Sequence, residues 1–406
     1  MASFQVRRWV PQAVPPSGLP RRARRGCDYK VYLPDPLAER AFLLDGAVAA
    51  DVAQAELAVA DFDRRARILV DTQALARLLL RTESVASSWI EGLAVGPRRL
   101  LRAAARLNDR PHDVTAADVM ANVVALRFGT ETVRQGGKIT LDLILEIHRF
   151  LLQSTLQSAH AGKLRTVQNW IGSGGYNPCD AVFVPPPPDL VESLMRDLCA
   201  FCNADVLPAV AQAAIAHAQF ENIHPFADGN GRVGRALIHL ILRRRGLSQR
   251  TLPPISLVLA SSRDDYFAAL RASAYVGKPE SAAAREAVNA WVERFALTTS
   301  QAVGHADSFE KHIDRLEIRW RKRLGRVRAG SAVDLLLRHL PQVPILTAQD
   351  AADVIGRSFE AANNAIAQLV GARVLTPQKE TRRNRTFEAS ELLTAFADFE
   401  RRLTAP

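Results

Sequence analysis

The chain has 406 residues, 48% of them hydrophobic, and its 53 Lys and Arg against 42 Asp and Glu give a formal net charge of +11 at pH 7. This apolar content excludes a disordered chain, and the length allows two or three domains. No apolar run reaches the ~18 residues that cross a bilayer, and the N-terminus lacks the apolar stretch of a secretory signal. The sequence therefore predicts a cytoplasmic protein without a membrane segment.

The positive charge is concentrated in two segments. Residues 1–26 hold six arginines and no acidic residue, and residues 311–330 hold eight Lys and Arg against two acidic residues. Segments of this kind can bind nucleic acid or acidic surfaces. A solvated arm and a solvated helix face are the simpler explanation. Four prolines among residues 1–26 predict an extended, unpacked arm.

Helical periodicity begins within residues 36–66 and continues in residues 71–90. The second helix is predicted to end at Glu91 and Gly92, because glycine suits a helix C-terminus. Further helices are predicted over residues 115–134, 141–156, 190–203, 206–223, 233–242 and 280–297, and a long basic helix over residues 306–328.

Two short β-type runs surround a glycine-rich loop. The first lies within residues 166–171 and the second is residues 181–184, which four prolines follow. This pattern predicts a β-hairpin over residues 166–184.

The most informative stretch is His224-Pro225-Phe226-Ala227-Asp228-Gly229-Asn230-Gly231-Arg232-Val233-Gly234-Arg235, between two apolar helices. Its glycines let main-chain N–H groups converge on a ligand, and the N-terminus of the following helix favours an anion. Arg232 and Arg235 are three residues apart, so they project from one helix face. The stretch predicts a phosphate site with a base and a metal ligand beside it. An ordinary polar turn is the alternative, and a P-loop is excluded because no Lys-Ser/Thr pair follows the glycines.

This stretch resembles the Fic family signature, H-P-F-x-[DE]-G-N-G-R-x-x-R, at every defined position. A looser resemblance extends over about residues 30–300. It implies an all-α Fic fold, which is a helical core with a β-hairpin flap. It also implies an enzyme that transfers AMP from ATP, with Mg²⁺, to a Ser, Thr or Tyr hydroxyl of a protein.

The resemblance implies a role for each residue of the loop. His224 would take the proton of the target hydroxyl, Asp228 would hold Mg²⁺ against the phosphates, and Phe226 would anchor the loop. The other phosphate contacts would come from Gly229, Asn230 and Gly231 as an anion hole, with the Asn230 amide on the α-phosphate, and from Arg232 and Arg235, the latter on the γ-phosphate.

An inhibitory motif is implied by the same resemblance. Ser87, Glu91 and Gly92 fit [ST]-x-x-x-E-[GN], the pattern of the inhibitory helix in autoinhibited Fic proteins. Glu91 would pair with Arg235 and so keep that arginine from ATP, while Ser87 lies one turn earlier on the same helix face. A capped, exposed helix end is the alternative.

The resemblance also assigns two features for ligand binding. The 166–184 hairpin would be the flap, which holds a protein target in extended form through main-chain hydrogen bonds. Tyr266 would line the nucleobase pocket, with a half-buried structural tyrosine as the alternative.

The four cysteines predict neither a disulfide framework nor a metal site. Cys199 and Cys202 lie within a helical pattern and are predicted to be buried there. Cys27 and Cys179 are far apart and have no predicted pairing. His217 is predicted to be a core histidine, because nothing supplies a third ligand for a metal.

The last part of the chain is predicted to be a winged-helix-like α/β domain. Two short helices, residues 347–355 and 358–370, precede a charged hairpin that contains Lys379, Arg382, Arg383 and Arg385. The second helix offers polar side chains but no Lys or Arg for DNA contacts. DNA binding and a protein-interaction or homodimer module therefore remain alternatives.

The predicted domains are a basic extended arm (1–28), an N-terminal helical region with the inhibitory helix (29–110), a Fic catalytic domain (111–300), a basic linker helix (301–330) and the winged-helix-like domain (331–406). The predicted activity is protein AMP transfer, including self-modification. The alternatives are another nucleotide or phosphate donor on the same fold, removal of AMP, and a DNA-binding regulator.

Overall fold

The structure is a computed structural model that describes residues 1–10, 26–65, 72–96, 99–100, 113–172, 177–378 and 385–404. As predicted, these residues are mostly helical. They form two compact units. Unit 1 comprises Met1–Glu56, Phe128–Leu247 and Asp264–Leu297, and unit 2 comprises Leu57–Arg127, Ser248–Arg263 and Thr298–Pro406. The division into five predicted domains stays a prediction.

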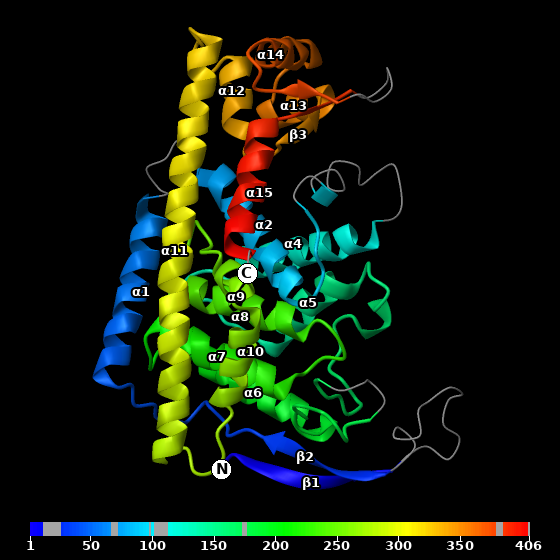
Figure 1. Cartoon of the computed structure of the whole chain (residues 1–406), viewed down its shortest axis with the longest axis vertical. Coiled ribbons are helices and arrows are strands. Elements are labelled where there is room, and N and C mark those ends of the chain that lie inside the picture. Colours follow the sequence, from blue (N-terminus) through cyan, green and yellow to red (C-terminus); the bar gives the residue numbers. More distant parts are fainter. Residues whose placement is uncertain are drawn as a thin grey trace. The chain divides into compact units, whose positions relative to one another are not determined.

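The core of unit 1 is a helical pair, α7 (Ala209–Ile223) and α8 (Asn230–Arg244), in which almost every side chain is buried. The two helices pack against each other (Figure 1). Alanines on α7 and Gly234 on α8 allow the close approach, since a Cβ on Gly234 would lie 2.5 Å from Glu221 Oε1. Unit 1 also contains α5 (Leu141–Leu152), η2 (Ser158–His160), α6 (Pro188–Asn203) and nearly all of α10 (Arg263–Ser273).

Unit 1 contains a two-stranded β-ribbon. Strand β1 (Ser3–Trp9) pairs antiparallel with β2 (Cys27–Leu33), from Ser3↔Leu33 to Trp9↔Cys27 (Figure 1). The prediction of an unpacked arm is therefore wrong for residues 3–9. Ser3–Arg7 alternate polar and apolar residues, which is the period of a strand. Arg7 and Arg8 interrupt this alternation, and Phe4 and Val6 are exposed in the structure, so the sequence signal for a packed strand was weak.

A disulfide between Cys27 and Cys179 corrects the prediction that these cysteines are unpaired. Their Cα atoms lie 5.8 Å apart although 152 residues separate them in the chain. Only the folded chain brings two such distant cysteines together, so spacing in the sequence held no signal for the pair. Cys199 and Cys202 are free and buried on α6, as predicted.

We expect Cys27→Ser to lower the free energy of unfolding by about 2–4 kcal/mol, because the cross-link restricts the unfolded chain across a long loop. Denaturant unfolding without reductant measures the difference. After reduction, the wild type and the variant should unfold at the same denaturant concentration. A difference that persists after reduction would assign the effect to serine packing instead of to the disulfide.

Unit 2 contains α2 (Thr72–Ile90), which packs on α9 (Ile255–Ser261). Glu83 of α2 accepts hydrogen bonds from the main-chain N–H (2.8 Å) and the hydroxyl of Ser256 at the start of α9. Helices α1 (Gly46–Arg65), α4 (Val114–Thr132) and α11 (Ala282–Leu324) each have residues in both units.

The long helix α11 corrects the prediction of separate helices over residues 280–297 and 306–328. It is one helix of 43 residues. No proline interrupts this segment. An added Cβ at Gly304 would meet no atom within 4 Å, so close packing does not require a glycine there. Pairs one turn apart, Asp307–Lys311 and Glu317–Arg321, stabilise the helix after the predicted break at residues 298–305.

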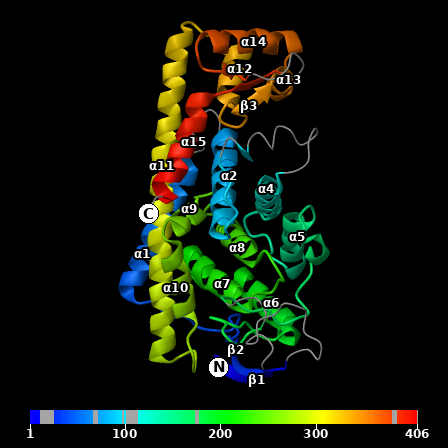
Figure 2. The same ribbon diagram turned by 45° about the vertical axis from the view of Figure 1, so that its right-hand side comes forward.

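The C-terminal part of unit 2 holds the two short helices predicted there. These are α13 (Ala348–Ile355), with a capping box between Thr347 and Asp350, and α14 (Phe359–Gly371), separated by the left-handed Gly356. The other elements are α12 (Ala332–His339), α15 (Ser390–Thr404) and a sheet in the order β3 (Ile345–Thr347), β5 (Thr386–Glu388), β4 (Thr376–Pro377). Figures 1 and 2 both show α12, α13 and α14 gathered beside β3.

The charged hairpin between β4 and β5 is described only in part. Lys379, Arg382 and Arg383 lie outside the described residues, and Arg385 is exposed. The winged-helix assignment and DNA binding therefore stay predictions. In the described ranges, no helix has both the length and the apolar character needed to cross a membrane.

Candidate active site

His224 directly follows α7 and turns the chain with a left-handed conformation, φ 49° and ψ 60°. A residue with a Cβ adopts this conformation at a cost of about 1–2 kcal/mol, so its surroundings must hold it. Its main-chain N–H still donates to Phe220 O (2.9 Å). The side chain is 20% exposed, and its Nδ1 lies 3.8 Å from Glu221 Oε2. The predicted base is thus partly open to solvent with a carboxylate beside it.

Asn230 closes the loop through its side chain. Its Oδ1 accepts from Phe226 N–H (2.8 Å) and its Nδ2 donates to Phe226 O (2.8 Å). These two hydrogen bonds use one of the two N–H groups of Nδ2, so the predicted contact of the Asn230 amide with a phosphate stays a prediction. The main-chain N–H groups at the start of α8 are further donors for an anion.

Gly229 begins α8 as its N-cap residue with φ 81°. A Cβ there would lie 2.9 Å from Leu151 Cδ2, so this position needs glycine for both conformation and space. The charged residues of the loop surround this helix start. The Asp228 carboxylate is 48% exposed and lies 3.6 Å from Arg232 Nη2, and Arg235 is 1% exposed. Asp228 and Arg232 thus lie together at the start of α8, and Arg235 is buried in the second turn of the same helix.

The donor set at this point suits a hard divalent cation. Mg²⁺ takes one or two carboxylates and completes its coordination with phosphates and water. Asp228 presents a half-exposed carboxylate beside the loop glycines. Within the described ranges, no three His, Cys, Asp or Glu side chains are grouped to hold a metal by themselves. Asp228 can supply one carboxylate to such an ion, and magnesium binding there stays a prediction.

His148 supports the loop from α5, and the sequence analysis missed it. Its ring stacks on Phe226, with centroids 3.7 Å apart, and its Nε2 lies 3.0 Å from Asp228 O. Gly162 N–H donates to Nδ1 (3.1 Å), so Nε2 carries the proton and donates to the carbonyl. Burial lowers the pKa of His148 to about 4. A neutral imidazole therefore braces the loop near neutral pH.

His217 is a core histidine, as predicted. It is 0% exposed, and its Nε2 lies 2.8 Å from the hydroxyl of Tyr266. Burial, and then the positive charge of Arg235, lower its pKa to about 3. Tyr266 is 1% exposed and its ring is parallel to that of His217. Its contact with a nucleobase stays a prediction.

Acid is expected to destabilise the protein partly through His217. The imidazole is neutral in the folded state down to about pH 3 but is protonated in the unfolded chain below about pH 6.5. As pH falls between these values, the unfolded state binds the extra proton, so stability falls by about 1.4 kcal/mol per pH unit. Urea unfolding between about pH 7 and pH 4.5 should show a weaker pH dependence for His217→Gln than for the wild type. Equal slopes would assign the acid sensitivity to other groups.

The predicted inhibitory motif lies at the end of α2 in unit 2. The helix ends at Ile90, and Gly92 adopts φ 84°, which confirms the predicted helix end. Ser87 is 3% exposed, whereas Glu91 is exposed. Arg263 Nε donates to Ile90 O (2.7 Å) and so caps the last turn. The pairing of Glu91 with Arg235 stays a prediction.

In the predicted flap, one antiparallel bridge joins Ile171 and Phe183, and Ile171 N–H donates to Phe183 O (2.8 Å). Within the described part of residues 166–184, which lacks residues 173–176, the pairing is limited to this bridge. Tyr32 N–H of β2 donates to Val184 O (2.9 Å). Val167 and Val182 are 66% and 56% exposed. Their apolar side chains are available to a partner.

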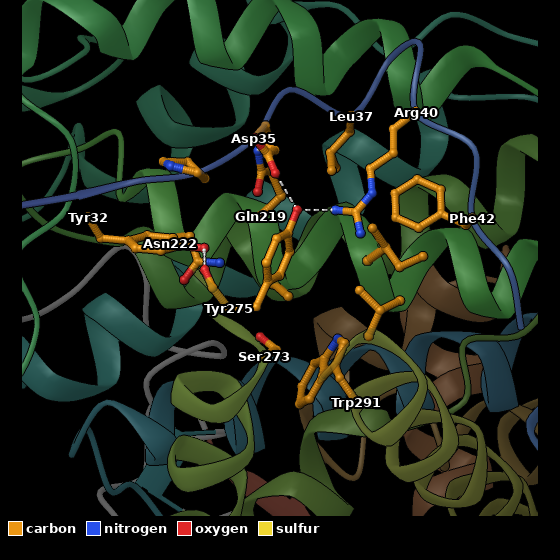
Figure 3. Close-up of a pocket in the computed structure, with 14 residues that line it drawn as sticks. Tyr32, Asp35, Leu37, Arg40, Phe42, Gln219, Asn222, Ser273, Tyr275 and Trp291 are labelled. Carbon is orange, nitrogen blue, oxygen red and sulfur yellow. Dashed lines mark hydrogen bonds between the residues drawn. The ribbon is translucent and has the colours of Figure 1, made fainter. Parts of the chain in front are cut away.

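A small cavity elsewhere in unit 1 holds none of the predicted site residues. It measures about 40 Å³ and is lined by residues of β2, the following loop, α7, α10 and α11 (Figure 3). Arg40 Nη1 donates to the Tyr275 hydroxyl (2.6 Å), which donates to Asp35 Oδ2 (2.5 Å). This volume suits water and is too small for a nucleotide.

The sequence analysis missed four side chains that contact the loop or His224. They are His148, Arg165, Asn169 and Glu221. His148, Arg165 and Asn169 lie 55 to 80 residues before their partners, so no local motif marks them. Glu221 is three residues before His224 on α7, and that helical spacing was a usable signal.

Comparisons with known proteins agree with this site. Residues 138–242 match the Fic/DOC family, and residues 49–131 match the Fic/DOC family N-terminal region. The chain is 32% identical over 158 residues to protein adenylyltransferase fic-1 of Caenorhabditis elegans, which covers 38% of this chain and 28% of that protein. It is 40% identical over 103 residues to a probable protein adenylyltransferase of Aquifex aeolicus, which covers 24% of this chain and 30% of that protein.

A solved structure shares the fold. It is a Fic family protein from Desulfovibrio desulfuricans, with a TM-score of 0.53, 22% identity, and coverage of 86% of this chain and 97% of that one. The curated relatives are matched over less than a third of their length. The two family matches and the complete signature loop at residues 224–235 show a Fic/DOC family domain over residues 138–242, preceded by the N-terminal region of that family over residues 49–131.

Proposed function

We propose that the protein transfers AMP from ATP to a Ser, Thr or Tyr hydroxyl of a protein target, or of its own chain. The observation that carries the proposal is the loop from His224 to Arg235, where a partly exposed histidine, a half-exposed carboxylate and two arginines meet at one helix N-terminus. The names of the matched relatives, protein adenylyltransferases, support the same reaction.

In this proposal His224 takes the proton from the target hydroxyl as that oxygen attacks the α-phosphorus of ATP. Glu221, 3.8 Å from Nδ1, stabilises the imidazolium that results. The attack breaks the bond between the α- and β-phosphates, so the products are AMP-modified protein and pyrophosphate. His224 then releases the proton to solvent.

The other loop residues bind phosphate. The main-chain N–H groups at the start of α8 face the α-phosphate, since a helix N-terminus favours an anion. Arg235 holds the terminal phosphate and Arg232 assists, because a guanidinium matches phosphate with a planar pair of donors. Asp228 would hold Mg²⁺, which when bound would neutralise phosphate charge.

The proposal is tested by comparing donors side by side. Purified full-length protein and its Glu91→Gly variant are incubated with cell lysate and with labelled ATP, UTP, GTP or CDP-choline. Label transfer from ATP, with AMP located on a hydroxyl side chain by mass spectrometry, is the expected result. Transfer from another donor alone would replace AMP transfer with a different reaction on the same fold. No transfer from any donor, by either protein, would remove the proposal.

Autoinhibition by Glu91 is the second part of the proposal. Glu91 directly follows α2, which ends at Ile90, and Gly92 completes the motif that begins at Ser87. A carboxylate paired with Arg235 would occupy the guanidinium that the γ-phosphate needs. ATP would then bind weakly or with its α-phosphate out of line for attack.

A further inference from the structure

Arg165 is a buried arginine in the segment that leads into the flap, and among the residues that the structure describes no carboxylate pairs with its charge. The residue is 4% exposed, and each of its four side-chain hydrogen bonds goes to a main-chain carbonyl. Burial lowers the pKa of Arg165 to about 10, so the side chain remains charged at neutral pH. A buried charge is costly unless its hydrogen bonds are satisfied, so this arrangement depends on the carbonyls that surround it.

Those carbonyls come from three segments. Nε donates to His224 O (2.8 Å) and Nη2 donates to Ile223 O (3.3 Å), both at the end of α7. Nη2 also donates to Pro186 O (2.5 Å), which follows the second limb of the flap. Nη1 donates to Val167 O (3.3 Å) in the first limb. One guanidinium therefore joins both limbs of the flap to the turn that carries His224.

The same segment satisfies four consecutive carbonyls of the turn. Besides Ile223 O and His224 O, the main-chain N–H of Arg165 donates to Pro225 O (2.9 Å), and Asn169 Nδ2 donates to Phe226 O (3.0 Å). The last carbonyls of a helix lack helical partners, and Ile223 O and His224 O lie at the end of α7. Donors from residues 165–169 therefore replace the missing partners and hold the strained conformation.

We propose that Arg165 is a positioning residue, which holds the left-handed turn at His224 in a fixed position relative to the two limbs of the flap. The imidazole and the hydroxyl of a target held on the flap then keep a constant relative position. This inference rests on the proposed AMP transfer for its role in catalysis. Misplacement of a reacting group by about 1 Å costs on the order of 100-fold in rate. Loss of the Arg165 guanidinium is therefore expected to slow the chemical step more than it weakens ATP binding.

The test uses Arg165→Lys in the full-length protein, with and without Glu91→Gly. Lysine keeps the charge but cannot bridge carbonyls of three segments. Arg165→Ala would remove the donor of two buried hydrogen bonds, to Pro186 O and Ile223 O, and impair folding. The matched control is Arg244→Lys, a buried arginine of unit 1 that donates to Asn203 O (2.6 Å) and Asp205 (2.5 Å).

Two readouts are measured for each variant. The kinetic readout is kcat for AMP transfer together with the dissociation constant of ATP. The structural readout is the imidazole cross-peak of His224 in histidine-labelled protein, assigned by its loss in His224→Ala. We expect Arg165→Lys to lower kcat by about 10–100-fold with ATP affinity within about twofold, and to shift or split the His224 cross-peak. Arg244→Lys is expected to lose a similar amount of thermal stability. It should neither lower kcat nor change the His224 cross-peak.

An unchanged His224 cross-peak in Arg165→Lys, or a kcat no lower than that of Arg244→Lys, would overturn the proposal. The structural readout needs no activity. If the wild type and Glu91→Gly transfer no AMP, the proposed function fails, and the cross-peak still decides whether Arg165 positions His224.

Discussion

Replacement of His224 with alanine is expected to abolish AMP transfer while ATP binding stays near the wild-type level. The imidazole acts on the incoming hydroxyl, and the residues assigned to the phosphates are Asp228, Arg232, Arg235 and the main-chain N–H groups of α8. Loss of a general base costs about 10²–10⁴-fold in rate. Initial rates with labelled ATP and equilibrium ATP binding are measured on the same preparations.

The control for this prediction is His160→Ala, because His160 is an exposed histidine of the same unit. It should transfer AMP at the wild-type rate. His224→Ala that labels its target as fast as the wild type would remove the base assignment. A loss of ATP binding as large as the loss of rate would instead place His224 in nucleotide binding.

Replacement of Glu91 with glycine is expected to raise AMP transfer, including self-modification, by about 10–100-fold. This range corresponds to the roughly 1.5–3 kcal/mol of a hydrogen bond to a charged group, if the carboxylate must leave Arg235 before ATP binds productively. The gain should vanish when His224→Ala is added, because the base is needed in either state. The measurement is the initial rate for the wild type, Glu91→Gly and the double variant at equal ATP.

Two glutamine variants separate charge from backbone effects. Glu91→Gln removes the charge without adding a glycine and should also raise the rate. Glu360→Gln removes an exposed carboxylate of unit 2 and should not. If Glu91→Gly transfers AMP no faster than the wild type, Glu91 is a charge at a helix end without an inhibitory role. The roles proposed for the residues of the loop would not be affected by that result.

Much of the helical architecture could be predicted from the sequence because each helix carries its own periodic signal. The end of α2 at Ile90, the apolar pair α7 and α8, and the two short helices α13 and α14 all follow from local pattern and from glycine or capping residues. The boundary predicted inside α11 was wrong, since a change of composition does not end a helix in the absence of a breaker.

The sequence by itself determined the loop that carries the candidate chemistry. His224, Asp228 and Arg235 are close in the chain, so a local motif was sufficient to bring them to one helix N-terminus. Their family membership followed from the same twelve residues. Local spacing also placed Ser87 and Glu91 at a helix end, although their role still depends on the tests above.

Only the tertiary structure decided what holds that loop in place. Arg165 meets His224 across 59 residues, His148 meets Asp228 across 80, and Cys27 pairs with Cys179 across 152. The fold also uses the Asn230 side chain to close the turn at Phe226, a contact that the motif by itself did not indicate. Contacts of this kind depend on how helices and loops pack, and packing leaves no periodic or local trace in a single sequence.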